Sequence, residues 1–308
     1  MQTPAQRPLV SVVIPTYHRA FAMLKQAMDS VRAQTYAPVE LIVVSDNPPE
    51  SEDARQIAEG MATRPDARLI QLEQNSGAPV ARNRGIAEAK GELIAFLDDD
   101  DVWLPQKLEK QVPCFADPDV GLVYCRGYMV DGDDVYDAKH RTDYFNARWG
   151  FRTSVTFDDL LVRDSIGTTS QAVVRKCCFE TCGGFDERLR ARQDYDRWLA
   201  ITQKFKAVGV DEPLFLFHCH SGERITSSPQ KALKANAAVF QKYHSDYLRN
   251  RMACMAYYYN RAFLYRQLKK PWRYLSSSLR SFCWQPVGFI RKYRSYRQEA
   301  ANWKEGPA

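Results

Sequence analysis

The sequence lacks several short patterns that assign proteins to familiar enzyme classes. No Gly-x-Gly-x-x-Gly follows the first apolar run, so a dinucleotide site is not supported, and neither a P-loop nor a nucleophile elbow is present. The eight cysteines contain no Cys-x-x-Cys pair, and only Cys177, Cys178 and Cys182 lie close together. A zinc site or a disulfide framework is therefore not expected, and we predict reduced, mostly buried thiols.

Long apolar segments are also missing. No apolar run approaches the roughly 18–20 residues that are needed to span a bilayer. The N-terminal sequence Met-Gln-Thr-Pro-Ala-Gln-Arg-Pro has no apolar core of the kind found in signal peptides, so we expect a cytosolic protein. The 308 residues are 45% hydrophobic, which is enough for a substantial core in one large domain with an appendage, or in two domains.

Acidic residues are scarce in the last part of the chain. Residues 231–308 hold 16 Lys and Arg against three acidic residues, a net charge of +13, whereas the whole chain has a net charge of +6. The same segment holds 16 of the 37 aromatic residues and has helical spacing. This mixture predicts peripheral attachment to an anionic membrane surface. Packing or oligomer contact is the alternative, and no recognition motif supports nucleic-acid binding.

The first hundred residues alternate between β-rich apolar runs and helical patterns. Strands are predicted at 10–15, 40–45, 67–72 and 93–97, with helices between them at 21–34, 51–63 and 79–89. This alternation predicts right-handed βαβ units and a doubly wound, mostly parallel α/β sheet. Further strands are predicted at 121–125, 171–174 and 214–218 and helices at 175–181 and 195–204, whereas the polar residues 131–158 are interpreted as a loop.

Four consecutive aspartates follow the fourth predicted strand. This aspartate run consists of Asp98, Asp99, Asp100 and Asp101. Open α/β sheets bind their ligands at the carboxyl ends of their strands. Because adjacent carboxylates repel one another and no Cys or His is interleaved, Mg²⁺ or Mn²⁺ is favoured over zinc as the counter-charge. A solvated acidic turn is the alternative for the run taken alone.

Polar residues also follow the first two predicted strands. Thr-Tyr-His-Arg follows the first strand at 16–19, and Asp46 ends the second. Polar groups at neighbouring strand ends are typical of nucleotide sites in open sheets. An Asp in such a place can accept hydrogen bonds from a ribose or from a base N–H. Taken alone, Asp46 is more readily interpreted as a turn-forming residue beside Asn-Pro-Pro at 47–49.

Five segments, in this order, make the chain resemble the family 2 glycosyltransferases of the GT-A fold. They are Val-Val-Ile-Pro-Thr-Tyr-His-Arg at 12–19, Ile-Val-Val-Ser-Asp at 42–46, Asn-Ser-Gly-Ala-Pro-Val-Ala-Arg-Asn-Arg-Gly at 75–85, Phe-Leu-Asp-Asp-Asp-Asp at 96–101, and Gly-Gly-Phe-Asp-Glu at 183–187 with Gln-Asp-Tyr-Asp-Arg-Trp at 193–198. The resemblance covers residues 9–228. It implies a GT-A catalytic domain over 1–230, with a nucleotide-sugar half at 9–125 and an acceptor half at 126–230, followed by a basic, aromatic, helical extension over 231–308.

The resemblance implies roles for individual residues. The donor, with a UDP-sugar favoured, is expected to contact Thr16, Tyr17, Arg19, Asp46, Arg82, Asn83, Asp98 and Asp99. Asp100 is expected to ligate the Mn²⁺ or Mg²⁺ ion that bridges the diphosphate, as in the family's DXD motif. The family usually has a small residue where Asp99 stands, so Asp101 is an alternative metal ligand.

Two weaker expectations concern the acceptor half. The segment at 218–226 resembles a lid in the family, in which His220 would be a further metal or phosphate ligand and Arg224 a cationic contact. Surface or packing histidines are the alternative for His218 and His220. Gly-Thr-Thr at 167–169 falls where the family forms part of the acceptor or phosphate pocket.

The resemblance implies that Asp194 is the general base. An inverting transfer needs a carboxylate beside the acceptor hydroxyl, opposite the leaving group. The family usually has Glu-Asp here, whereas this chain has Gln193 before Asp194, which removes one negative charge. Asp196 is an alternative base, although two residues along a helix it should face elsewhere. Without the resemblance, Asp194 would be interpreted as a first-turn acid of a helix.

Together these features imply an inverting, metal-dependent glycosyltransferase. Its substrates would be a nucleotide-diphosphate sugar and a hydroxyl of a glycan or lipid-linked acceptor, in cell-surface polysaccharide synthesis such as that of lipopolysaccharide. A non-catalytic nucleotide-sugar-binding subunit is one alternative, against which the retained Asp194 and aspartate run count. A polyprenyl-phosphate glycosyltransferase is another, against which the missing transmembrane segments count.

Overall fold

The computed structural model describes residues 7–131, 141–143, 151–219 and 228–302. The chain divides into two compact units. The first comprises residues 1–157, 165–188 and 193–222, and the second comprises 158–164, 189–192 and 223–308. Among the described helices, each is either too short or too polar to cross a membrane. The seven cysteines that the structure describes are free thiols. Only Cys125, Cys178 and Cys254 are buried, so the prediction that most of the thiols are buried is wrong for this part of the chain.

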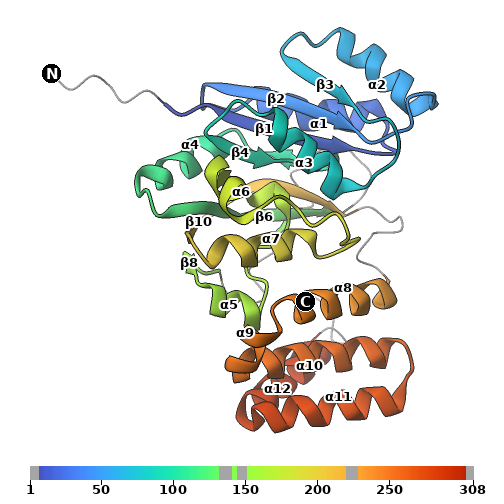
Figure 1. The fold of residues 1–308 in the computed structure, drawn as a ribbon, viewed down its shortest axis with the longest axis vertical. Coiled ribbons are helices and arrows are strands. Elements are labelled where there is room, and N and C mark those ends of the chain that lie inside the picture. The colour runs from blue at the N-terminus through green and yellow to red at the C-terminus, as the bar shows by residue number, and fades with distance from the viewer. Residues whose placement is uncertain (1–6, 132–140, 144–150, 220–227, 303–308) are drawn as a thin grey trace, which may run out of the picture. The chain divides into compact units, whose positions relative to one another are not determined.

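A mixed β-sheet forms the centre of the first unit, and helices flank it (Figure 1). Its order is β3-β2-β1-β4-β9-β6-β10-β5, with β7 added to β6 and β8 added to β10. The strands are β1 Val10–Thr16, β2 Val39–Ser45, β3 Ala67–Gln71, β4 Leu93–Phe96, β5 Val102–Trp103, β6 Val120–Asp131, β7 Arg141–Asp143, β8 Ser154–Val155, β9 Val173–Arg175 and β10 Lys206–Cys219. Strands β3, β2, β1 and β4 are parallel, which confirms the predicted βαβ units.

The helices that flank the sheet follow the apolar spacing of the sequence. They are α1 Phe21–Arg32, α2 Glu52–Ala62, α3 Ala78–Glu88, α4 Lys107–Gln111, α6 Lys176–Cys182 and α7 Gln193–Thr202. The remaining short helix of this part of the chain, α5 Phe157–Val162, belongs almost entirely to the second unit. In α1, residues Leu24, Met28 and Val31 recur at helical spacing and are buried. All seven residues of β1 are buried as well, because this strand lies between β2 and β4 inside the sheet.

Two predicted boundaries in the second half of the sheet are wrong. β10 begins at Lys206 rather than at residue 214, and its pairing with β6 is irregular around Val210 and Pro213. The charged residues and the proline of this stretch break the apolar pattern of a strand. The sequence therefore did not predict the first half of β10, whose register shifts at bulges. In addition, the interval 131–158, interpreted as a loop, contributes the short strands β7 and β8.

The second unit contains five consecutive helices. They are α8 Pro229–Lys242, α9 His244–Arg249, α10 Arg251–Gln267, α11 Pro271–Trp284 and α12 Pro286–Asn302. Figure 1 shows α10 and α11 side by side as a helical hairpin. Side-chain caps begin two of the helices, since Ser228 accepts from the Lys231 N–H and Asn250 accepts from the Ala253 N–H.

The first residue of helix α4, Lys107, is buried. The Lys107 Nζ donates to the Gln111 Oε1 at 2.6 Å and lies 4.2 Å from the centre of the Trp103 ring. Gln111 in turn donates to the carbonyl oxygens of Val123 and Gln171. Burial lowers the pKa of Lys107 to about 8, because the charged ammonium loses its hydration.

This burial makes the stability of the first unit depend on alkaline pH. The pKa of Lys107 is lower in the folded chain than in the unfolded chain, so between about pH 8 and pH 10.5 the unfolded chain binds more protons. Below about pH 8, burial of the charged Lys107 lowers the free energy of unfolding by its full amount. This unfavourable contribution disappears as the pH rises toward 10.5. We expect the free energy of unfolding of Lys107→Met, relative to wild type, to fall by about 3 kcal/mol from pH 7 to pH 10.5 in urea titrations.

Lys110→Met is the matched control, because Lys110 lies on the same helix but is exposed. Its unfolding free energy relative to wild type should change little over the same pH range. A flat difference for Lys107→Met as well would mean that the buried ammonium does not lose its proton in this window.

Candidate active site

Three strand ends meet at one edge of the sheet. Strands β2, β1 and β4 are neighbours and run parallel, so Asp46, residues 16–19 and the aspartate run follow adjacent carboxyl ends. The backbone joins these ends directly, since the Asp46 N–H donates to the Thr16 carbonyl oxygen at 2.9 Å. The predicted grouping of polar residues at three neighbouring strand ends is confirmed.

Arg19 lies against the middle of the aspartate run. Its Nε donates to the Asp99 carboxylate at 3.1 Å, and its Nη2 donates to the Asp100 carboxylate at 2.8 Å. Arg19 and Asp100 are both half-buried, so solvent screens these ion pairs less than it screens surface pairs. The end of β1 thus supplies a cation to the acids that follow β4.

Asp98 is held by a second set of partners. The Arg82 Nη2 donates to the Asp98 Oδ1 at 2.6 Å, and the Thr169 hydroxyl donates to the same oxygen at 3.1 Å. The Thr168 hydroxyl is 3.4 Å from the Oδ2, and the backbone N–H of Asp98 donates to the Ser170 hydroxyl at 3.0 Å. Residues 167–169, expected in the acceptor or phosphate pocket, therefore support the aspartate run in this structure.

The four aspartates do not have equal access to solvent. Burial raises the pKa of Asp99 to about 6, although the nearby Arg19 opposes the shift. Burial raises the pKa of Asp101 well above its usual range, and the negative Asp100 adds to this effect. Asp101 also accepts the His218 backbone N–H at 3.2 Å. Asp98 and Asp100 are therefore the more accessible carboxylates of the run.

Asp46 organises the segment before α3. One of its carboxylate oxygens accepts the Ser76 N–H and the other accepts the Gly77 N–H, both at 2.7 Å. Gly77 has a φ of 96°, a conformation that favours glycine, and it precedes the first residue of α3. The Asp46 side chain thus joins β2 to the start of the helix that carries Arg82 and Asn83. Its predicted contact with a nucleoside stays a prediction.

Asn83 holds the loop that precedes α7. Its Oδ1 accepts the Phe185 N–H at 2.7 Å, and its Nδ2 donates to the Phe185 carbonyl and to the Glu187 carboxylate, both at 2.9 Å. A Cβ atom on residue 184 would come within 2.4 Å of the Asn83 Oδ1, so a larger residue in place of Gly184 would displace the Asn83 side chain. The amide is thus engaged with the protein, and its donor contact stays a prediction.

Tyr17 projects from the end of β1. Its ring is 44% exposed and makes an edge contact with the ring of His18, whose Nδ1 lies 2.6 Å from the Asp53 carboxylate. The His18 N–H donates to the Asn47 side chain at 2.9 Å. Thr16, by contrast, is buried at the strand end. An exposed aromatic ring fixed beside cations and carboxylates can stack on a flat ligand such as a nucleobase.

Asp194 lies in the first turn of α7 and is half-buried. Its Oδ1 accepts the Tyr195 N–H at 2.7 Å. Asp196, the alternative base, is fully buried among the inward-facing residues of the helix. The Trp198 Nε1 donates to the Gly167 carbonyl at 2.9 Å, which ties α7 to the segment that supports Asp98. The sequence pattern identified Trp198 as an inward-facing residue but not this link.

His220 and Arg224 lie outside the described residues. Among the described residues, no group of three or more His, Cys, Asp and Glu is arranged to hold a metal ion. Mg²⁺ and Mn²⁺ sites in phosphate-handling enzymes, however, often use one or two carboxylates and complete their coordination with substrate phosphates and water. The accessible carboxylate oxygens of Asp98 and Asp100 fit a site of this kind, in which protein and substrate together coordinate the ion.

The sequence of the chain is similar to those of known glycosyltransferases. The family model for glycosyl transferase family 2 matches residues 11–176. TuaG of Bacillus subtilis, a glycosyltransferase named for teichuronic acid biosynthesis, is 31% identical over 242 residues, which cover 77% of this chain and 88% of TuaG.

Two solved structures share the fold. TarS 1–349 of S. aureus in complex with UDP-GlcNAc has a TM-score of 0.65 at 16% identity, covering 94% of this chain and 92% of that one. The mannosyltransferase PcManGT from Pyrobaculum calidifontis, in complex with GDP-Man and Mn²⁺, has a TM-score of 0.57 at 21% identity, covering 90% and 75%. The fold is GT-A, and the chain belongs to the family 2 glycosyltransferases.

Proposed function

We propose that the protein transfers a sugar from a nucleotide-diphosphate sugar to a hydroxyl of a glycan or lipid-linked acceptor in cell-surface polysaccharide synthesis. The meeting of residues 16–19, Asp46 and the aspartate run at one sheet edge is the observation that carries this proposal. The name of TuaG, which refers to a cell-wall polysaccharide, supports the setting. The donor complexes of TarS and PcManGT support a nucleotide-sugar donor, and we favour a UDP-sugar.

Donor binding would use the groups that this edge presents. The exposed ring of Tyr17 is suited to stack on the base, and Arg19 is suited to contact the diphosphate. Arg82 would keep Asp98 oriented toward the ribose, since it already holds that carboxylate at 2.6 Å. Arg224 and His220, which lie outside the described residues, would add contacts to the diphosphate.

Asp100, with Asp98 beside it, would hold a Mn²⁺ or Mg²⁺ ion together with the donor. Such an ion stabilises the negative charge that develops on the departing nucleoside diphosphate. The presence of Mn²⁺ in the complex of PcManGT supports this assignment. Asp101 is the poorer candidate ligand, because it is buried and its pKa is raised.

Asp194 would act as the general base of an inverting transfer. It takes the proton of the acceptor hydroxyl while that oxygen bonds to the anomeric carbon and the bond from this carbon to the phosphate oxygen breaks. The Tyr195 N–H that donates to Asp194 favours the ionised carboxylate needed for this role.

Nucleotide binding should depend on a divalent cation and on Asp100. We expect one of UDP, GDP and dTDP to bind in calorimetry with Mn²⁺, and its affinity to fall about tenfold or more in Asp100→Ala, because the shared metal loses a protein ligand. The matched control is Asp101→Asn, which keeps an oxygen for the His218 N–H and should retain metal-dependent binding. The absence of binding by any of the three nucleotides would contradict the proposed donor class.

Loss of the base should separate catalysis from donor binding. Asp194→Asn is expected to lower kcat by about 10²–10⁴-fold while nucleotide affinity stays unchanged, because the base acts on the acceptor proton. Turnover can be followed as nucleoside diphosphate release from UDP-GlcNAc, UDP-glucose or GDP-mannose, with water as acceptor if no better one is found. Gln193→Asn is the control, since it changes a neutral neighbour. Equal loss in Gln193→Asn and Asp194→Asn would count against Asp194 as the base, and donor binding without turnover in wild type would favour the non-catalytic alternative.

A further inference from the structure

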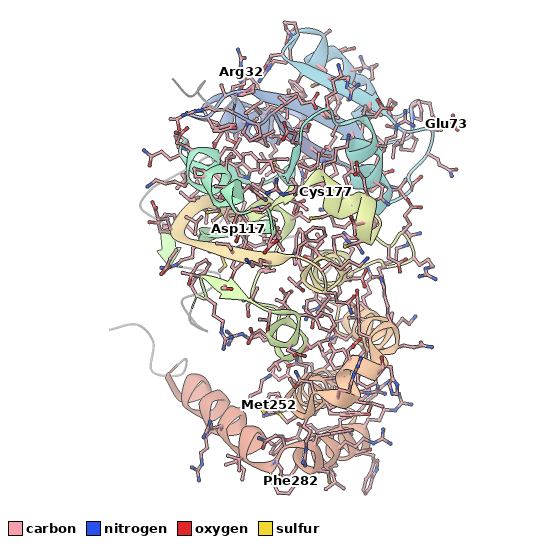
Figure 2. All side chains as sticks on the ribbon, turned by 60° about the vertical axis from the view of Figure 1, so that its left-hand side comes forward. Arg32, Glu73, Asp117, Cys177, Met252 and Phe282 are labelled. Atoms are coloured by element: carbon pink, nitrogen blue, oxygen red, sulfur yellow. The ribbon has the colours of Figure 1, made fainter. Side chains whose placement is uncertain are left out.

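Helix α11 presents its large apolar residues to solvent. Trp272, Leu275, Leu279 and Phe282 recur at spacings of three, four and three, so they share one face of the helix, which we call the α11 stripe. Trp272 is 82% exposed and Leu279 is 63% exposed. Figure 2 labels Phe282 at the edge of the second unit, where its ring also contacts Phe289 of α12. Contiguous exposed apolar side chains of this size mark an interaction surface.

The opposite face of α11 carries two serines between two half-buried aromatic residues, Tyr274 and Trp284. Ser277 and Ser281 are its buried residues, and the Ser281 hydroxyl donates to the Met255 carbonyl of α10 at 2.8 Å. Small side chains let the two helices of the hairpin approach closely. The fully buried residues of α11 are therefore small, whereas four of its large apolar residues are exposed, unlike in an ordinary amphipathic helix of a water-soluble protein.

Cations flank the α11 stripe on the side toward α10. Arg273 and Arg280 are exposed and seven residues apart, about 100° around the helix from Trp272 and Leu279, and their guanidinium groups lie over the α10 rings of Tyr265 and Tyr258. Lys269 and Lys270 are exposed at the turn that precedes the helix. A row of cations next to an exposed apolar row matches the geometry of a helix that lies in a lipid interface.

The composition of this region points to an anionic partner. Residues 247–298 contain 12 Lys and Arg and no Asp or Glu. A second copy of the same surface would bring like charges together, which disfavours a symmetric dimer through the α11 stripe. A nucleic acid would match the charge but would leave four large apolar side chains without an apolar partner.

We propose that α11 docks on the surface of an anionic phospholipid bilayer. The α11 stripe enters the boundary between headgroups and acyl chains, and the phosphates contact a cationic row formed by Lys269, Lys270, Arg273 and Arg280. This docking is independent of the sugar-transfer chemistry, because it uses none of the residues placed at the sheet edge. The proposal names one helical face as the site of the membrane contact that the basic composition of residues 231–308 predicts.

Vesicle sedimentation of the full-length protein tests the proposal. Wild type is expected to bind vesicles of phosphatidylglycerol and phosphatidylcholine at least about tenfold more tightly than vesicles of phosphatidylcholine alone, and to dissociate as salt is raised. Leu275→Gln/Leu279→Gln should weaken binding about tenfold or more, because two exposed apolar side chains are lost. Lys269→Gln/Lys270→Gln should weaken binding to the anionic vesicles only.

Control variants, a folding check and tryptophan fluorescence separate docking of α11 from unfolding and from a general loss of positive charge. Ser276→Gln changes an exposed residue of α11 that is outside the stripe, and Lys90→Gln/Lys204→Gln removes the same charge from the first unit, so both should bind like wild type. Circular dichroism checks that each variant is folded. Vesicle binding should shift tryptophan emission to shorter wavelength, and Trp272→Phe should bind but lose most of this shift.

Four outcomes would overturn the proposal. Equal binding to both vesicle types would show that the lipid charge plays no part in binding. Unchanged binding by Leu275→Gln/Leu279→Gln would show that the α11 stripe does not contact the vesicle. A full emission shift in Trp272→Phe would place another surface in the lipid. Self-association of wild type that these leucine substitutions abolish, with no vesicle binding, would identify a second copy of the chain as the occupant.

Discussion

The balance of charge on the aspartate run is the constraint on which the site depends. Four adjacent carboxylates repel one another strongly when part of their surface is withdrawn from water. Arg19 and Arg82 supply two cations, and burial favours the neutral form of Asp101 by raising its pKa. These two arginines follow β1 and lie on α3, so the charge balance exists only when the parallel βαβ units have formed. Fold and site are thus coupled through the same ion pairs.

Asp98 extends this coupling to residues 167–169 and to α7 of the first unit. Its carboxylate is bound by Arg82 and the two threonines of residues 168–169, and the adjacent Gly167 carbonyl accepts the indole N–H of Trp198. Trp198 lies on α7, four residues after Asp194. A continuous set of contacts therefore connects the proposed metal site to the helix that carries the proposed base. Such support is what positions catalytic groups within the small tolerances that group transfer requires.

The sequence predicted the parallel half of the sheet well, because its strands are short apolar runs separated by helices of regular period. It also predicted that residues 16–19, Asp46 and the aspartate run would meet, since parallel strands in neighbouring positions end at one edge. It could not predict the partners of those side chains. Arg19 and Asp99 are 80 residues apart, and Asn83 binds the backbone of Phe185, 102 residues away. Such pairings depend on loop geometry, and so does the irregular first half of β10.

In helix α11, apolar periodicity alone does not identify the buried face. Apolar residues at spacings of three and four normally identify the face that packs on the core, because water is the assumed solvent. In α11 the fully buried residues are Ser277 and Ser281, and the α11 stripe points outward. Moving that face from water into a lipid interface would recover hydrophobic free energy that folding alone leaves unused, and the neighbouring cations would set the sign of the lipid charge. The same apolar periodicity can therefore mark a face that packs on the core or a face that enters a lipid interface. The exposure of the face and the charges beside it distinguish the two.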